Sequence, residues 1–170
     1  MDIERLVVDT NIMDNAFMAG KEPCAKQSAG KVLFFIADSM NMVIALDKAD
    51  MGDSPFILKE YRKNLGGYRD FEVYWMNLQG MQKVVYVQGV CSKEADKVFD
   101  DWGLQEEDRV FLYTAMGADK IIITEDSDFG VGKGKEQYKH RFDYITNDMG
   151  VMIFDANHFL DVKARSELSN

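Results

Sequence analysis

Residues 121–129 read Ile121-Ile122-Ile123-Thr124-Glu125-Asp126-Ser127-Asp128-Phe129, a β-branched run that passes directly into acidic residues. A run that is apolar at every position is typical of a strand buried on both faces of a parallel sheet. The chain opens with a similar pattern, Leu6-Val7-Val8-Asp9-Thr10-Asn11. Two buried strands that both end in acids predict a parallel α/β fold with its chemistry at the carboxyl ends of the strands.

The rest of the sequence alternates short apolar runs with longer amphipathic stretches, as strand–helix units do. Further strands are predicted at 42–46, 84–87 and 151–154, and helices at 23–40, 55–65, 68–78, 93–102, 106–116 and 156–160. Ser54 and Ser92 are interpreted as N-caps and Gly103 as a helix end. We therefore predict a single domain, residues 1–170, folded as a three-layer α/β/α sandwich with a central, mainly parallel sheet of about five strands.

The composition fits a globular protein, because 46% of the 170 residues are hydrophobic and 29% are charged. The longest apolar run, Val32 to Ala37, is far shorter than the roughly 20 residues of a membrane span. The N-terminus is acidic and does not resemble a secretory signal. Cys24 and Cys91 have no disulfide or metal-ligand spacing, so we expect two buried, reduced thiols in a cytoplasmic protein without membrane contact.

The formal net charge of -9 disfavours broad nonspecific affinity for nucleic acid, because phosphate contacts require lysine and arginine. It is compatible with a site that concentrates carboxylates, which repel one another until a cation fills the site. Asp9 follows the first predicted strand, and Asp126 and Asp128 follow the fourth. If these strands are neighbours, the carboxylates meet at one edge of the sheet. Oxygen ligands without nearby His or Cys favour Mg²⁺ or Mn²⁺ over zinc.

Each acid also has an ordinary structural interpretation. An Asp after a strand, such as Asp9, is often a turn or N-cap residue. Asp108 suits the first turn of a helix, where the helix dipole favours negative charge. Glu60 suits a solvated helix face with local ion pairs. It is the order of these acids along the chain, rather than any one of them, that indicates a shared site.

These motifs, taken together, resemble those of PIN-domain nucleases over residues 6–160. Val7-Val8-Asp9-Thr10-Asn11 is similar to the opening motif of that family, and Glu60-Tyr61-Arg62 with Leu65 to the second, where Asp50 and Asp53 are alternatives to Glu60. Asp108-Arg109-Val110-Phe111 with Ala115 resembles the third motif, and residues 123–129 resemble the fourth. Gly150-Val151-Met152-Ile153-Phe154 with Phe159-Leu160 resembles the closing strand and helix.

The resemblance implies an endoribonuclease that uses Mg²⁺ or Mn²⁺. It implies a set of metal ligands and catalytic acids, with Asp128 in an auxiliary role: Asp9, Glu60, Asp108, Asp126 and Asp128. Thr10 and Asn11 would orient Asp9, and Thr124 would hydrogen-bond Asp126 or the substrate phosphate. RNA is the implied substrate. An antitoxin protein is the implied partner if the chain is a toxin rather than an RNA-processing enzyme, and a homodimer is left open.

The segment 130–141 is the main basic stretch of the chain. It contains Lys133, Lys135, Lys139 and Arg141 against one acid, Glu136, which gives a net charge of +4 - 1 = +3. Because the segment follows Asp126 and Asp128 directly, we predict that its four basic side chains bind the phosphate backbone of the substrate. The alternative is a solvated surface loop.

Other functions fit the motifs less well. A haloacid dehalogenase-like phosphatase needs a second acid two residues after the first, where this chain has Asn11. A receiver domain needs an acid after its third strand, where this chain has Gln88-Gly89. A metal-free ribonuclease needs two placed imidazoles, and His140 and His158 lie in no such motif. A PIN-like module that binds RNA or protein without turnover remains an alternative.

Overall fold

The sheet of this protein is parallel throughout. The computed structural model describes residues 3–18, 20–50, 53–132 and 135–167. Within these residues five strands form one sheet: β1 (Glu4–Val8), β2 (Met42–Asp47), β3 (Val84–Val87), β4 (Ile121–Ile123) and β5 (Met152–Phe154). Their order is β3-β2-β1-β4-β5, and each neighbouring pair is parallel. The predicted α/β class and the parallel sheet are confirmed.

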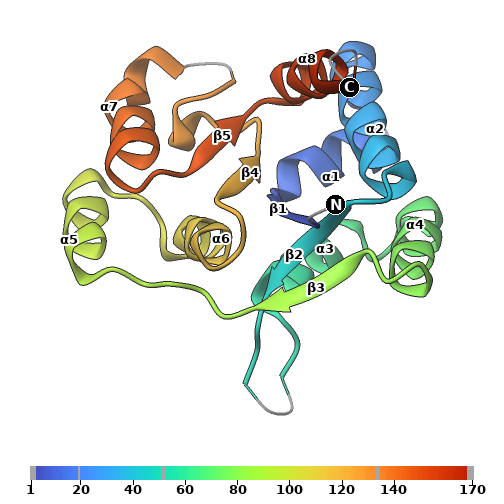
Figure 1. The fold of residues 1–170 in the computed structure, drawn as a ribbon, viewed down its shortest axis with the longest axis horizontal. Helices are drawn as coiled ribbons and strands as arrows, with labels where there is room; N and C mark the ends of the chain where they lie inside the picture. The colour runs from blue at the N-terminus through green and yellow to red at the C-terminus, as the bar shows by residue number, and fades with distance from the viewer. Residues whose placement is uncertain (1–2, 19, 51–52, 133–134, 168–170) are drawn as a thin grey trace.

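Helices cover both faces of this sheet, which makes the predicted three-layer α/β/α sandwich. Figure 1 shows α2, α4 and α8 on one side of the strands and α5, α6 and α7 on the other. The helices are α1 (Thr10–Phe17), α2 (Pro23–Asp38), α3 (Phe56–Leu65), α4 (Arg69–Gly80), α5 (Lys93–Trp102), α6 (Glu106–Gly117), α7 (Lys139–Asp143) and α8 (Ala156–Glu167). Three short helices, η1 (Ser127–Phe129), η2 (Lys135–Tyr138) and η3 (Tyr144–Asp148), lie between β4 and β5.

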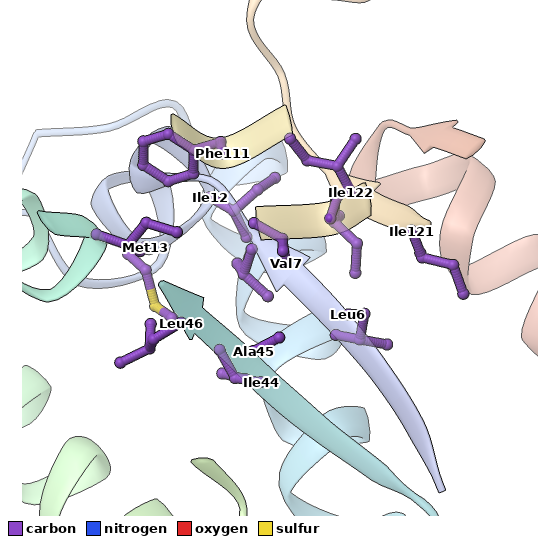
Figure 2. Packing of buried hydrophobic residues seen from close by; sticks show 14 of the residues in the cluster. Leu6, Val7, Ile12, Met13, Ile44, Ala45, Leu46, Phe111, Ile121 and Ile122 are labelled. Carbon is purple, nitrogen blue, oxygen red and sulfur yellow. The ribbon is translucent and has the colours of Figure 1, made fainter. Parts of the chain in front are cut away.

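The two central strands, β1 and β4, form the middle of the core. Residues 6–8 of β1 and Ile122 and Ile123 of β4 are completely buried, because helices cover both faces of the sheet at this point. Ile12 of α1 and Phe111 of α6 lie around the same strands (Figure 2). The chain leaves β1 toward β2 and leaves β4 toward β5, so the strand order reverses between β1 and β4. Open α/β sheets bind ligands at such a reversal.

The two ends of α5 follow from local residues, Ser92 and Gly103. The Ser92 hydroxyl accepts a hydrogen bond from the Ala95 N–H (3.2 Å) at the start of α5, and Gly103 ends α5 in the left-handed region with φ +66°. Both features were predicted. The sequence pattern predicts no helix at α1, and it predicts a shorter α8 than the structure contains.

The start of α3 differs from the prediction. Ser54 is not its N-cap; the cap position is Pro55, and Asp47 at the end of β2 supplies the acceptors. The carboxylate of Asp47 accepts hydrogen bonds from the N–H groups of Phe56 (2.7 Å) and Ile57 (2.8 Å). Because these unsatisfied helix donors find an acid nine and ten residues earlier in the chain, a rule that considers only adjacent residues does not find it.

The expectation for the two cysteines is wrong in one respect. Cys24 and Cys91 are free thiols, but both are exposed rather than buried. Cys24 lies in the first turn of α2, and Cys91 lies in the connection before α5. None of the helices in the described part of the chain has both the length and the apolar character needed to cross a membrane.

Candidate active site at the carboxyl ends of β1 and β4

Asp9 is fixed where β1 and β4 end. Its backbone N–H donates to the Ile123 carbonyl (2.9 Å), so the ends of the two strands lie side by side. Its carboxylate Oδ2 accepts hydrogen bonds from the Thr124 hydroxyl (2.6 Å) and from the Asn11 amide (2.8 Å). Asp9 is only 7% exposed. The side chain is therefore held in one position by residues from both strand ends.

Asn11 and Thr124 join the first and fourth motifs into one hydrogen-bond network. The Asn11 amide also donates to the Thr124 hydroxyl (3.2 Å), and its carbonyl oxygen accepts from the Glu125 N–H (2.9 Å). The Thr124 oxygen accepts a further bond from the Asp126 N–H (3.0 Å). The hydroxyl of Thr10 is buried and has no hydrogen-bond partner within the described residues. Segments more than 110 residues apart thus position one another.

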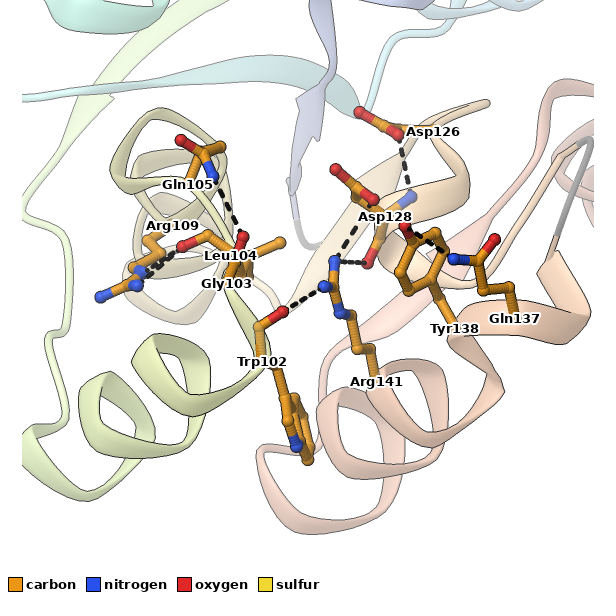
Figure 3. Close-up of polar contacts among 10 residues, drawn as sticks. All are labelled: Trp102, Gly103, Leu104, Gln105, Arg109, Asp126, Asp128, Gln137, Tyr138 and Arg141. Carbon is orange, nitrogen blue, oxygen red and sulfur yellow. Dashed lines mark hydrogen bonds and ion pairs between the residues drawn. The ribbon is translucent and has the colours of Figure 1, made fainter.

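Asp126 and Asp128 shape the turn that follows β4. Asp126 Oδ1 accepts from the Asp128 N–H (2.9 Å), which starts the short helix η1. Asp128 Oδ1 forms an ion pair with Arg141 Nη1 at 3.2 Å (Figure 3). Arg141 also donates to the Trp102 carbonyl, and its guanidinium lies over the Tyr138 ring at 4.2 Å from the centroid. Asp128 is therefore tied to the end of α5 and to α7 through one buried arginine.

Asp108 lies in the first turn of α6 and approaches the acids that follow β1 and β4 from that helix. Burial raises its pKa from 3.8 to about 7, and the charges of Asp126, Asp9 and Asp128 add to the rise. Within the described residues no ion pair or hydrogen bond lowers this pKa. Acids from three separate segments therefore act on one another here, which is the pattern that perturbed functional carboxylates show.

Asp9 is perturbed in the same direction. Burial raises its pKa to about 6, the hydrogen bond from Thr124 opposes the rise, and the charge of Asp126 adds to it. The pKa values of Asp9 and Asp108 therefore lie close to physiological pH, whereas an ordinary aspartate titrates near pH 4.

Glu60 lies apart from this group. On α3 its carboxylate pairs with Lys63 Nζ at 3.3 Å, a contact within its own helix. The charges that act on Asp9 and Asp108 do not include Glu60. Its alternatives Asp50 and Asp53 are exposed in the long connection between β2 and α3, which extends away from the sheet (Figure 1). The structure brings together Asp9, Asp108, Asp126 and Asp128 but not the acid of the second motif.

The predicted basic segment is divided between surface and interior. Lys133 lies outside the described residues, as does the side chain of Lys135, the first residue of η2. Lys139 is exposed at the start of α7. Arg141 is only 6% exposed and is held by protein contacts.

Gly130, with φ +77°, lets the chain pack back on α7. A Cβ there would lie 2.6 Å from the Phe142 Cβ and 2.9 Å from the Tyr138 carbonyl oxygen. A side chain at this position would meet both steric conflict and a strained backbone. The start of the segment is therefore packed against α7 rather than free.

Two features of the site were not predicted from the sequence, although some of their residues belong to the motifs. The buried Tyr61 hydroxyl of α3 donates to the Val8 carbonyl, one residue before Asp9, and so joins α3 to the end of β1. A pocket of about 630 Å³ opens beside Asn11 and Asp126, and Asn15 contributes to its lining. Asn15 lies one turn after Asn11 on α1, so the prediction of a helix at this point would have placed both amides on one face.

The chemistry of this donor set fits a hard divalent cation. Mg²⁺ and Mn²⁺ prefer carboxylate and other oxygen ligands, which Asp9, Asp108, Asp126 and Asp128 supply. In residues 3–18, 20–50, 53–132 and 135–167, no three or more Asp, Glu, His or Cys side chains already form a metal-binding group. The charges of Asp126, Asp9 and Asp128 act on Asp108, although the four carboxylates of the described residues do not converge on one point.

Comparison of this chain with protein-family models, with curated proteins and with solved structures finds no match. The function is therefore inferred from the geometry of the site and from the motifs that build it.

Proposed function

We propose that this protein is a PIN-like, metal-dependent endoribonuclease that hydrolyses RNA phosphodiester bonds at Asp9, Asp108 and Asp126. The observation that carries the proposal is the meeting of acids from separate segments where β1 and β4 end: Asn11 and Thr124 hold Asp9 there, and the Asp126 N–H is bonded to the same threonine. Burial raises the pKa of Asp108 of α6 to about 7, and the charges of both acids add to the rise. Carboxylates at such close range repel one another unless the site has a cationic ligand. RNA as the substrate comes from the resemblance of the motifs.

The side chains around the acids would orient the ligand set. Asp9, Asp108 and Asp126 would hold Mg²⁺ or Mn²⁺, which supplies a Lewis acid and stabilises charge on the phosphoryl oxygens. Asn11 and Thr124 hold the Asp9 carboxylate in place through the bonds described above.

Asp128 is the auxiliary acid in this proposal, because its carboxylate is paired with Arg141. Glu60 is not part of the ligand set that we propose, because it pairs with Lys63 on its own helix. The exposed Lys139 remains a candidate for a phosphate contact, whereas the buried Arg141 acts through Asp128.

A cleavage assay tests the proposal. We expect the protein to cut single-stranded RNA with Mn²⁺ or Mg²⁺ and to leave 5′-phosphate and 3′-hydroxyl ends. Asp9→Asn and Asp126→Asn should abolish cleavage, because each removes a charged oxygen ligand. Asp161→Asn, the same change at an exposed position of α8, should not. Tight RNA binding without products would instead identify a binding module and refute the nuclease.

The resemblance extends the proposal to partners. If the protein is the toxin of a toxin–antitoxin pair, its expression in the cytoplasm should arrest growth, and Asp9→Asn should restore it. A small cognate antitoxin would then copurify with the protein. Growth that continues normally under strong expression of an active nuclease would favour a role in RNA processing.

A further inference from the structure

The pocket beside the carboxylates has a lining that the proposed metal chemistry does not use. It has a volume of about 630 Å³ and lies between α1, the start of α2, the turn after β4 and the start of α8. Asn11 and Asp126 belong to both the pocket and the site described above. A volume of this size is in the range of pockets that hold small organic ligands.

The charges of the lining select against an anion. Three acids, Glu22, Glu125 and Asp126, and one lysine, Lys21, line the pocket. A bare phosphate group would therefore be repelled from this pocket, while an uncharged ligand would not. Apart from the Cys24 thiol, the remaining polar lining consists of amide and hydroxyl side chains, which can donate and accept hydrogen bonds.

Two of these amides have hydrogen-bonding groups that no contact of the described residues uses, which leaves them available to a ligand. Asn15 forms no side-chain hydrogen bond within the described residues, although it lies at the pocket. Asn157 Oδ1 accepts from the Ser28 hydroxyl (2.7 Å), a bond that leaves the Asn157 NH₂ group available. Asn11, by contrast, uses its amide groups on Asp9, Thr124 and Glu125. Unused amide donors and acceptors that face one pocket can pair with the edge of a base.

We infer that this pocket binds one nucleoside of the substrate, next to the phosphate that is cleaved at Asp126, and that Asn15 and Asn157 read its base. The inference rests on the proposed function, because it makes the neighbouring carboxylates the place where the flanking phosphate lies. A nucleoside is uncharged and rich in hydrogen-bonding groups, so it matches a lining that repels phosphate. The protein should then cut RNA with a preference for the base in this pocket.

Binding of single nucleosides tests the inference without metal and without turnover. The four ribonucleosides are titrated into the full chain while the side-chain NH₂ signals of Asn15 and Asn157 are followed by NMR. We expect one nucleoside to shift both signals more strongly than the other three. Asn15→Ala should weaken its Kd by roughly two- to tenfold, the effect of one lost hydrogen bond. Asn77→Ala, the same change on an exposed face of α4, should leave the Kd unchanged.

The possible results separate this inference from the proposed nuclease. RNA cleavage together with nucleosides that shift neither signal would overturn the pocket assignment and leave the nuclease standing. Selective nucleoside binding without RNA cleavage would support the pocket and refute the nuclease. In an active enzyme, a base preference at the cut that is lost in Asn15→Ala and kept in Asn77→Ala would support both. A preference unchanged in Asn15→Ala and Asn157→Ala would count against the pocket.

Discussion

Replacing the carboxyl group of Asp108 with an amide should stabilise the metal-free protein. Its pKa is raised from 3.8 to about 7, first by burial and then by the charges of Asp126, Asp9 and Asp128. The folded protein therefore holds a proton on Asp108 between about pH 4 and 7 that the unfolded chain releases. Stability falls as the pH rises through this window, and the destabilisation is complete only above pH 7. Asp108→Asn removes it.

The magnitude follows from the size of the shift. About three pKa units correspond to about 4 kcal/mol, and we halve this to about 2 kcal/mol because part of the side chain is open to solvent. For a chain of this length, about 2 kcal/mol is an increase in Tm of about 4–8 °C. At pH 5.5 the stabilisation by Asp108→Asn should shrink to about half. Asp108 of the folded wild-type protein is then protonated, so the remaining effect is the free energy that the unfolded chain gains by releasing this proton.

Thermal unfolding in a metal chelator at pH 8 and pH 5.5 measures this effect. Glu106→Gln is the matched control, because Glu106 is exposed in the same first turn of α6. It loses the favourable interaction with the helix dipole, a few tenths of a kcal/mol, without relieving buried charge. An Asp108→Asn protein that melts at or below the wild-type temperature at pH 8 would refute the reasoning. So would a gain that is larger at pH 5.5 than at pH 8.

Three further predictions concern the same site. The Tm increase caused by Mg²⁺ should diminish as the pH falls from 8 to 6. Metal ligands must be deprotonated, and the pKa values of Asp9 and Asp108 are about 6 and about 7. A Tm increase that does not depend on pH would exclude these two acids as ligands. Thr124→Val removes a hydroxyl that bonds Asp9, Asn11 and Asp126 and should cost about 2 kcal/mol in urea unfolding, and an unchanged midpoint would contradict the network. Arg141→Met should also destabilise by about 2 kcal/mol because it leaves Asp128 without its ion pair, whereas a change only in RNA affinity would place Arg141 at the substrate.

The sequence was sufficient for the parts of the site that depend on strand direction. Parallel strands end at the same edge of a sheet, so Asp9 and Asp126 could be placed together once their strands were recognised. That Asp108 lies near these acids was expected only from the order of the motifs. The structure shows the physical reason, which is the packing of α6 against β1 and β4.

Other parts depend on contacts that no local pattern contains. The cap of α3 comes from Asp47, across the long connection after β2. Arg141 is a charged residue, for which sequence rules predict exposure, and its burial depends on the Trp102 carbonyl 39 residues earlier in the chain and on Asp128. The eight-residue helix α1 buries only Ile12 and Met13, which is too little periodicity to identify a helix.

The central place of β1 in the sheet also bears on how the chain folds during synthesis. β1 is made first and can pair with β2 early, but its other neighbour, β4, is made more than a hundred residues later. Until then the buried carboxylate of Asp9 lacks Thr124, its partner 115 residues away. Contacts of such long sequence separation form slowly. A nascent chain released before β4 would therefore carry an incomplete sheet with a bare inner edge, the kind of surface on which chaperones act and on which aggregation begins.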